Sequence, residues 1–94
     1  MDKFIEKYTV ERQDGKSQVI DINGIKYLQS YETIVAKYDT GTEELTLLPK
    51  WDSSATTSRH MRQFINQQTV YHYESKKEFK KEIESHGKIF IEEK

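Results

Sequence analysis

The chain has 94 residues, a formal net charge of −1 and no cysteine. This length predicts a single domain over residues 1–94 with one small core. The near-neutral charge argues against a general polyanion binder, and the absence of cysteine excludes disulfides, thiolate catalysis and cysteine-ligated metal sites.

The sequence shows no signal-like apolar run after Met1 and no apolar stretch long enough to span a membrane. A small domain without disulfides also suits a reducing compartment. We therefore expect the protein to act in the cytoplasm of a bacterial host cell.

The first segment, residues 3–10, fits two patterns. Phe4, Tyr8 and Val10 suit one face of a strand, whereas Phe4, Ile5 and Tyr8 suit one turn of a helix. We favour the strand, and the helix remains the alternative.

A β-hairpin is predicted over residues 19–28. Two apolar runs, 19–22 and 25–28, flank Asn23 and Gly24. Both of these residue types accept a positive φ, as the type I′ turn requires, and the twist of that turn matches the flanking strands.

A second antiparallel pair follows. Residues 31–38 are rich in β-branched and aromatic side chains and are predicted to form a strand. Residues 39–42 form a polar turn, and residues 43–48 are predicted to pair with the first strand in antiparallel orientation. Pro49 ends the ladder because it has no N–H to donate.

The segment from Trp51 to Asn66 is predicted to be a capped amphipathic helix. Several residues that can cap its N-terminus come first: Asp52, Ser53, Ser54, Thr56 and Thr57. An apolar stripe at helical spacing should face the sheet: Thr57, Met61, Phe64, Ile65 and Gln68. The outer face carries Arg59, Arg62, Gln63 and Asn66. We assign a structural role to Trp51, Asp52, Ser54, Thr56, Thr57, His60 and Phe64.

Residues 70–73 form either a short strand or a connection to the second helix. Ser75 and Glu78 match a capping box, with Ser75 at the N-cap. The helix they begin has Phe79 and Ile83 as its clear apolar anchors, so it should lie at the surface.

Gly87 is expected just beyond the end of this helix, and residues 88–91 should form a last strand that pairs with the sheet. The fold class is therefore α+β: an antiparallel meander of five to six strands, packed by two helices and completed by a C-terminal strand.

The sequence contains the residue types of a hydrolytic triad and of a histidine metal site. Asp52, Ser53, Ser54 and His60 are the residue types of a hydrolytic triad, but serines before a helix are usually caps, and no nucleophile elbow is present. His60, His72 and His86 are loosely spaced for metal ligands. We expect no catalytic residue, no metal and no cofactor.

A basic patch is predicted on the two helices. Residues 59–81 contain six basic and two acidic side chains, which gives this segment a formal charge of +4. The rest of the chain therefore carries a formal charge of −5. The candidate partner-binding residues are these six basic residues together with two polar residues of the first helix: Arg59, Arg62, Gln63, Asn66, Lys76, Lys77, Lys80 and Lys81. The alternative is a solvated face, because Glu82 and Glu84 lie on the same second helix.

Part of the chain resembles a known type of domain. The pattern Leu28-x-Ser30-Tyr31-x-Thr33-x-Val35-Ala36, followed by Trp51-Asp52-x-Ser54-x-Thr56-Thr57-Ser58-x-His60-x-x-x-Phe64, is similar to a small domain that recurs in uncharacterised proteins of bacteriophages and mobile elements of Firmicutes. The resemblance covers residues 25–68. It departs at Ser53, where the family usually has an aromatic residue. The resemblance carries no catalytic residues over.

The resemblance implies a biological setting rather than a chemistry. Small accessory proteins of phages are often inhibitors of host defence, so we expect a non-enzymatic inhibitor, most like the type II anti-CRISPR proteins. Its partner would be an RNA-guided nuclease, whose guide-RNA loading or DNA binding it would block. Glu43 and Glu44 could imitate phosphates, while Arg59 and Arg62 could reach an acidic patch.

Two other functions are compatible with the sequence. The basic patch could bind DNA or RNA directly, as a nucleic-acid-binding accessory domain. Alternatively, an exposed sheet edge could pair with another chain in an assembly module, and the oligomeric state is left open.

Overall fold

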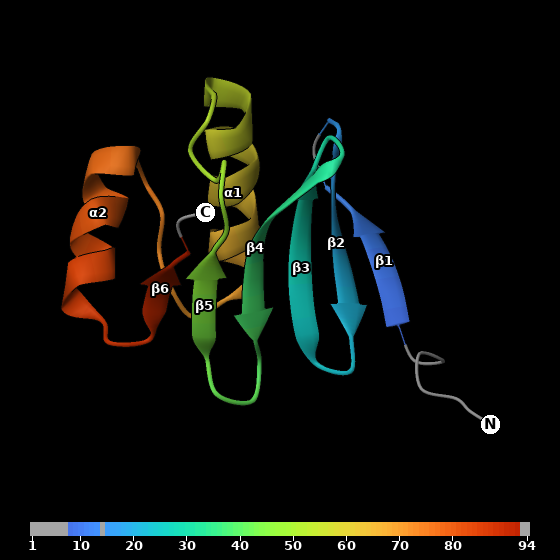
Figure 1. Ribbon diagram of the computed structural model, residues 1–94, viewed down its shortest axis with the longest axis horizontal. Coiled ribbons are helices and arrows are strands. Elements are labelled where there is room, and N and C mark those ends of the chain that lie inside the picture. Colours follow the sequence, from blue (N-terminus) through green and yellow to red (C-terminus); the bar gives the residue numbers. More distant parts are fainter. Residues whose placement is uncertain (1–7, 14, 93–94) are drawn as a thin grey trace.

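The computed structural model describes residues 8–13 and 15–92 (Figure 1). Its single sheet contains six strands that lie in the order of the sequence. The strands are β1 (Tyr8–Arg12), β2 (Ser17–Ile22), β3 (Ile25–Ser30), β4 (Thr33–Asp39), β5 (Glu44–Leu47) and β6 (Ile89–Ile91). Two helices lie between β5 and β6: α1 (Ala55–Gln68) and α2 (Lys76–Ser85).

The predicted α+β class is confirmed. Strands β1 to β5 form an antiparallel meander, and β6 pairs with β5 in parallel. The parallel pairing arises because two helices carry the chain back before β6 begins. Residues 8–10 of the ambiguous first segment belong to β1, in agreement with the strand interpretation, while residues 3–7 lie outside the described part.

The β2–β3 hairpin turns at the predicted pair. Asn23 has φ 55° and Gly24 has φ 89°, so both central residues occupy the region that a type I′ turn needs. The Gly24 N–H donates to a carboxylate oxygen of Asp21 over 3.1 Å, which further fixes the turn. The prediction from the Asn-Gly pair is confirmed.

Helix α1 begins at Ala55, and Ser54 is its N-cap. The extended backbone of Ser54 (φ −155°) lets its hydroxyl accept from the Thr57 N–H over 3.1 Å. Thr56 and Thr57 lie inside the helix. The buried face is formed by Thr57, His60, Met61, Phe64 and Ile65. His60 is wholly buried on this face, although the predicted apolar stripe did not include it.

Helix α2 begins as predicted. Ser75 is its N-cap and accepts from the Glu78 N–H over 3.2 Å. Phe79 is fully buried, stacked on the Tyr73 ring at 4.6 Å between centroids and edge-on to Trp51 at 5.9 Å. These three rings close one end of the core, where Trp51 was expected.

Residues 69–75 connect the helices and do not form a strand. The Asn66 side-chain amide holds this connection through two bonds of 2.8 Å: its NH₂ donates to the Tyr73 carbonyl, and its oxygen accepts from the Tyr73 N–H. The chain thus returns alongside α1, and α2 then runs in the same direction as α1 (Figure 1).

The core lies between α1 and one face of the sheet. Leu28, Ala36 and Leu47 are opposite one another in the strand register and are completely buried. Figure 1 shows α1 behind this side of the sheet. Among the described residues, neither helix has the length and apolar character needed to span a membrane.

Replacing Ser54 by alanine should lower the free energy of unfolding by about 1 kcal/mol, because the Thr57 N–H loses its acceptor. Urea unfolding followed by circular dichroism measures this change. Thr56→Ala is the matched control inside the same first turn and should stay within about 0.5 kcal/mol of the parent. Equal losses in both variants would contradict the assignment of the cap.

Stability should fall when the buried tyrosines ionise. Burial is the main cause that raises the pKa of Tyr38, Tyr71 and Tyr73 above the ordinary value of 10.0. The Tyr71 hydroxyl also donates to the Glu43 carbonyl over 2.6 Å, a bond that the phenolate cannot make. The folded state holds these protons more tightly than the unfolded state, so their contribution is complete below about pH 10 and is lost above it.

Thermal melts between about pH 8 and pH 11 should therefore show a falling midpoint above pH 10. The Tyr71→Phe variant should lose less stability over this range than the parent. A midpoint that is constant or rises with pH would contradict the effect of burial.

Candidate binding surfaces

The structure gives His60 a hydroxyl partner outside the residues considered for a triad, Asp52, Ser53 and Ser54. The hydroxyl bonded to His60 belongs to Ser30, over 2.8 Å between Oγ and Nδ1, and both side chains are buried. Thr57 lies 3.4 Å from Ser30 and accepts from Ser54 over 3.1 Å. This network links the helix cap to the core.

The sequence analysis assigned no role to Ser30, although this residue belongs to the pattern of the resemblance. The strand register reveals its setting, because it places Ser30 opposite Ser17 on the face of the sheet that α1 covers. A serine on a covered face requires a polar partner. His60 on the buried face of α1 is that partner, but neither residue reveals the other in the sequence.

The three histidines do not assemble a metal site. Among the described residues, no three His, Asp or Glu side chains come close enough to hold a metal ion. His72 is exposed, and His86 lies 3.4 Å from a carboxylate oxygen of Glu82 near the end of α2.

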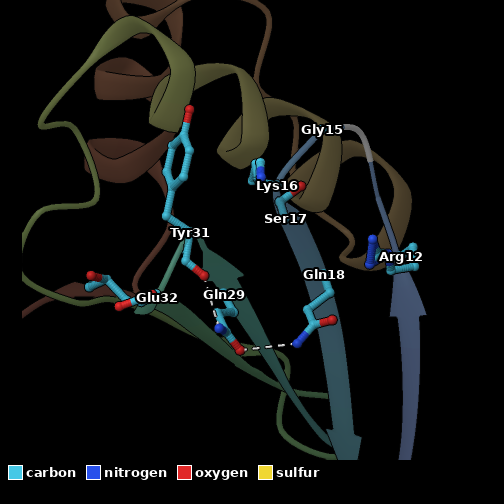
Figure 2. A pocket seen from close by; sticks show the side chains of 9 residues that line it. Arg12, Gly15, Lys16, Ser17, Gln18, Gln29, Tyr31 and Glu32 are labelled. Carbon is cyan, nitrogen blue, oxygen red and sulfur yellow. Dashed lines mark hydrogen bonds between the residues drawn. The ribbon is translucent and has the colours of Figure 1, made fainter.

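A polar hollow of about 670 Å³ lies at one end of the sheet (Figure 2). It is lined by Arg12, Gly15, Lys16, Ser17, Gln18, Gln29, Tyr31, Glu32 and Thr33. Gln29 accepts from the Gln18 amide over 3.1 Å and donates to the Tyr31 carbonyl over 2.9 Å, so these amides are already paired. The Ser17 hydroxyl is buried and accepts from Gln13 over 2.9 Å. We assign no reaction to this hollow.

Tyr31 borders the same hollow in an unusual conformation. Its φ is 59°, in the left-handed region that an aromatic residue seldom adopts. The side chain is 51% exposed, and its ring lies 5.8 Å from that of His60. In Figure 2 the Tyr31 ring points away from the sheet, so it stands as a raised wall of the hollow.

A second groove, of about 580 Å³, lies between the N-terminal ends of the two helices. Three of the predicted partner-binding residues meet here: Arg59, Arg62 and Lys76. Two carboxylates, Asp52 and Glu74, line it as well. Tertiary structure thus brings together basic residues that are up to 17 positions apart in the chain.

The remaining predicted residues have different surroundings. Lys77, Lys80 and Lys81 are exposed on α2. Gln63 is half-buried on α1, and the Asn66 amide is occupied by the backbone of Tyr73. The hydrogen bonds to Tyr73 give Asn66 a structural role within the chain. A role of Asn66 in partner binding stays a prediction.

The sheet has a second apolar face, which the helices do not cover. The register aligns Val10, Ile20 and Tyr27 in one row and Tyr8, Ile22 and Ile25 in the next. These six residues are called the open face below, and Phe90 of β6 lies farther along the first row, beyond Lys37 and Thr46. Tyr8 is 57% exposed, Val10 50% and Phe90 45%.

Charged residues border the open face on the side of β4 and β5. A shallow hollow of about 180 Å³ lies there, lined by Ile25, Tyr27, Lys37, Asp39, Glu44 and Thr46. In Figure 1 no described element lies in front of this face. The sequence contains a signal for it, because the 19–28 hairpin carries apolar side chains at both odd and even positions.

Comparison of the chain with curated proteins and with solved structures gives no match. One family model does match, over residues 5–85, and this range includes the hairpins and the whole of α1 and α2. The match covers most of the 94 residues. The chain therefore belongs to DUF8033, a family of unknown function.

Proposed function

We propose that this protein is a non-enzymatic binding protein that attaches to another protein through its open face. The observation that supports this proposal is the exposure of Tyr8, Val10 and Phe90 on a sheet face that no described helix covers. Exposed apolar patches with a polar border are typical of protein interaction sites.

The composition of the open face suits a protein better than a small molecule. Its centre, around Ile20 and Tyr27, carries no charge, whereas Lys37, Asp39 and Glu44 lie at its border. Interfaces place apolar and aromatic side chains at the centre and charged ones at the rim. The hollow on this face is also small, at about 180 Å³, below the range of typical ligand pockets.

For the biological role, we propose inhibition of a bacterial defence system, with an RNA-guided type II nuclease as the partner. The support is the resemblance of residues 25–68 to a domain of phages and mobile elements. By this proposal the protein is an anti-CRISPR that acts in the bacterial cytoplasm and blocks guide-RNA loading or DNA binding. Glu43 and Glu44 are both exposed, as imitation of phosphates would require.

A cleavage assay tests this role. The purified protein is mixed with the nuclease either before or after the guide RNA, and cleavage of target DNA is followed. We expect inhibition at stoichiometric amounts, stronger in one order of addition. Undiminished cleavage with several nuclease orthologues, in both orders, would exclude the proposed role.

The Val10→Lys variant tests the open face itself. It places a charge in the apolar row and should weaken partner binding by at least about tenfold, because burial of an unpaired charge is costly. Thr9→Lys is the matched control: the same charge on the adjacent β1 residue, which points to the other face. Both positions are exposed, so both variants should fold like the parent. Equal losses of inhibition would contradict the use of this face.

Direct binding of nucleic acid is the second candidate, favoured by the exposure of Lys77, Lys80 and Lys81 along α2. Fluorescence anisotropy with a random duplex and a single strand should then detect binding at about 50 mM salt, with affinity falling steeply as salt rises. Replacing one of these lysines by glutamine should reduce the salt slope by about 1. No binding at low salt would exclude this function.

A further inference from the structure

The groove between the two helices combines two helix N-termini at one place. Ser54 and Ser75 cap the helices, and the first helical residues, Ala55 and Lys76, both line the groove. Figure 1 shows α1 and α2 running in the same direction, with their N-terminal ends at the same end of the molecule. The positive ends of both helix dipoles therefore face one region.

The two parallel helices concentrate positive potential at this end of the molecule. Each N-terminus carries the equivalent of about half a positive charge, and its first N–H groups have no acceptor within the helix. The cap serines each satisfy one N–H, those of Thr57 and Glu78. The N–H groups before them in each helix remain available to an anion.

The side chains add to this positive potential. Arg59, Arg62 and Lys76 line the groove together with Asp52 and Glu74, so cations outnumber carboxylates. All five of these side chains are exposed, so water screens the carboxylates and the cations alike. Arginine suits phosphate in particular, because its planar group can donate two parallel hydrogen bonds.

Tyr73 provides an independent observation that points to a ligand. Its side chain is 2% exposed and lines the groove, yet its hydroxyl makes no hydrogen bond with acceptable geometry among the described residues. Burial raises the pKa of Tyr73, as does the nearby Asp52 carboxylate, whereas Ser58 and Arg62 lower it. The neutral hydroxyl therefore lies near a serine, an arginine and a carboxylate, and none of them accepts its proton with hydrogen-bond geometry. A buried polar group without a partner in the chain calls for an explanation, and a water or an ion bound at the site is one.

We propose that this groove is a phosphate-binding site, which takes inorganic phosphate or the phosphate group of a small monoester. The anion would accept from N–H groups of both helix ends, from Arg62 and from the Tyr73 hydroxyl. The site lies at the helix ends, so its occupation does not depend on any function of the open face.

Titration of the ¹⁵N-labelled protein with inorganic phosphate tests the proposal, at constant ionic strength maintained with chloride. Saturable shifts should appear at the amides of residues 54–59 and 73–77. Adenosine monophosphate and adenosine form a second pair of probes. Binding of the monophosphate but not of adenosine extends the site to monoesters, whereas binding of inorganic phosphate alone limits it to the free anion.

Variants separate binding from folding. Arg62→Gln should weaken phosphate binding by about tenfold or more, since it removes a charged hydrogen bond. Tyr73→Phe should weaken it roughly three- to tenfold. It should leave the thermal midpoint of the phosphate-free protein unchanged or higher, because it removes an unpaired buried hydroxyl.

Two further variants complete the test. Asp52→Asn should strengthen binding by removing a negative charge at the groove. Lys81→Gln, a change of charge on α2 outside the groove, should alter binding less than twofold. The absence of saturable shifts in the parent protein would overturn the proposal. An equal loss in Arg62→Gln and Lys81→Gln would also overturn it, because it would reveal general charge attraction instead of a site.

Discussion

The two hydrogen bonds between the Asn66 amide and the backbone of Tyr73 govern the arrangement of the C-terminal half. They hold the connection 69–75 against α1, so the chain returns to the level at which α1 begins. Helix α2 must then run parallel to α1, and β6 must pair in parallel with β5. The stacked Tyr73 and Phe79 rings reinforce the same geometry through burial. The Asn66 side chain thus anchors the connection that precedes α2 and, through α2, β6.

This geometry has an electrostatic consequence. Antiparallel helices offset each other's dipoles, whereas these two helices present their positive ends side by side. The cap residues Ser54 and Ser75 relieve only part of the unsatisfied hydrogen bonding. The buried Tyr73 hydroxyl adds another donor at the same place. Features that would destabilise a purely structural region thus coincide at the groove for which we propose an anion.

The sheet divides the molecule into two surfaces of different kind. One face packs on α1 around Leu28, Ala36 and Leu47, and it contains the polar network of Ser30 and His60. The open face carries Val10, Ile20 and Tyr27 without a described element over it. Among the described residues, α1 and α2 follow the meander and lie on the same side of the sheet, so neither helix covers the open face. The protein–protein function that we propose uses the face left uncovered.

Local chemistry in the sequence determined most of the elements. Asn23 and Gly24 specified the hairpin because few other pairs accept positive φ, and Ser75 specified the start of α2 through its side-chain oxygen. The periodicity of Met61, Phe64 and Ile65 identified the buried side of α1. Each of these signals lies within a few residues, so it can be read without knowledge of the fold.

Only the tertiary structure decided which distant residues meet. The choice of Ser54 among five possible caps depends on where the chain leaves the buried Trp51. The Ser30–His60 bond, the groove between the helix ends and the open face each depend on strand register or on the direction of α2. Such contacts join residues that are far apart in sequence, and their formation is set by the packing of whole elements rather than by local preference.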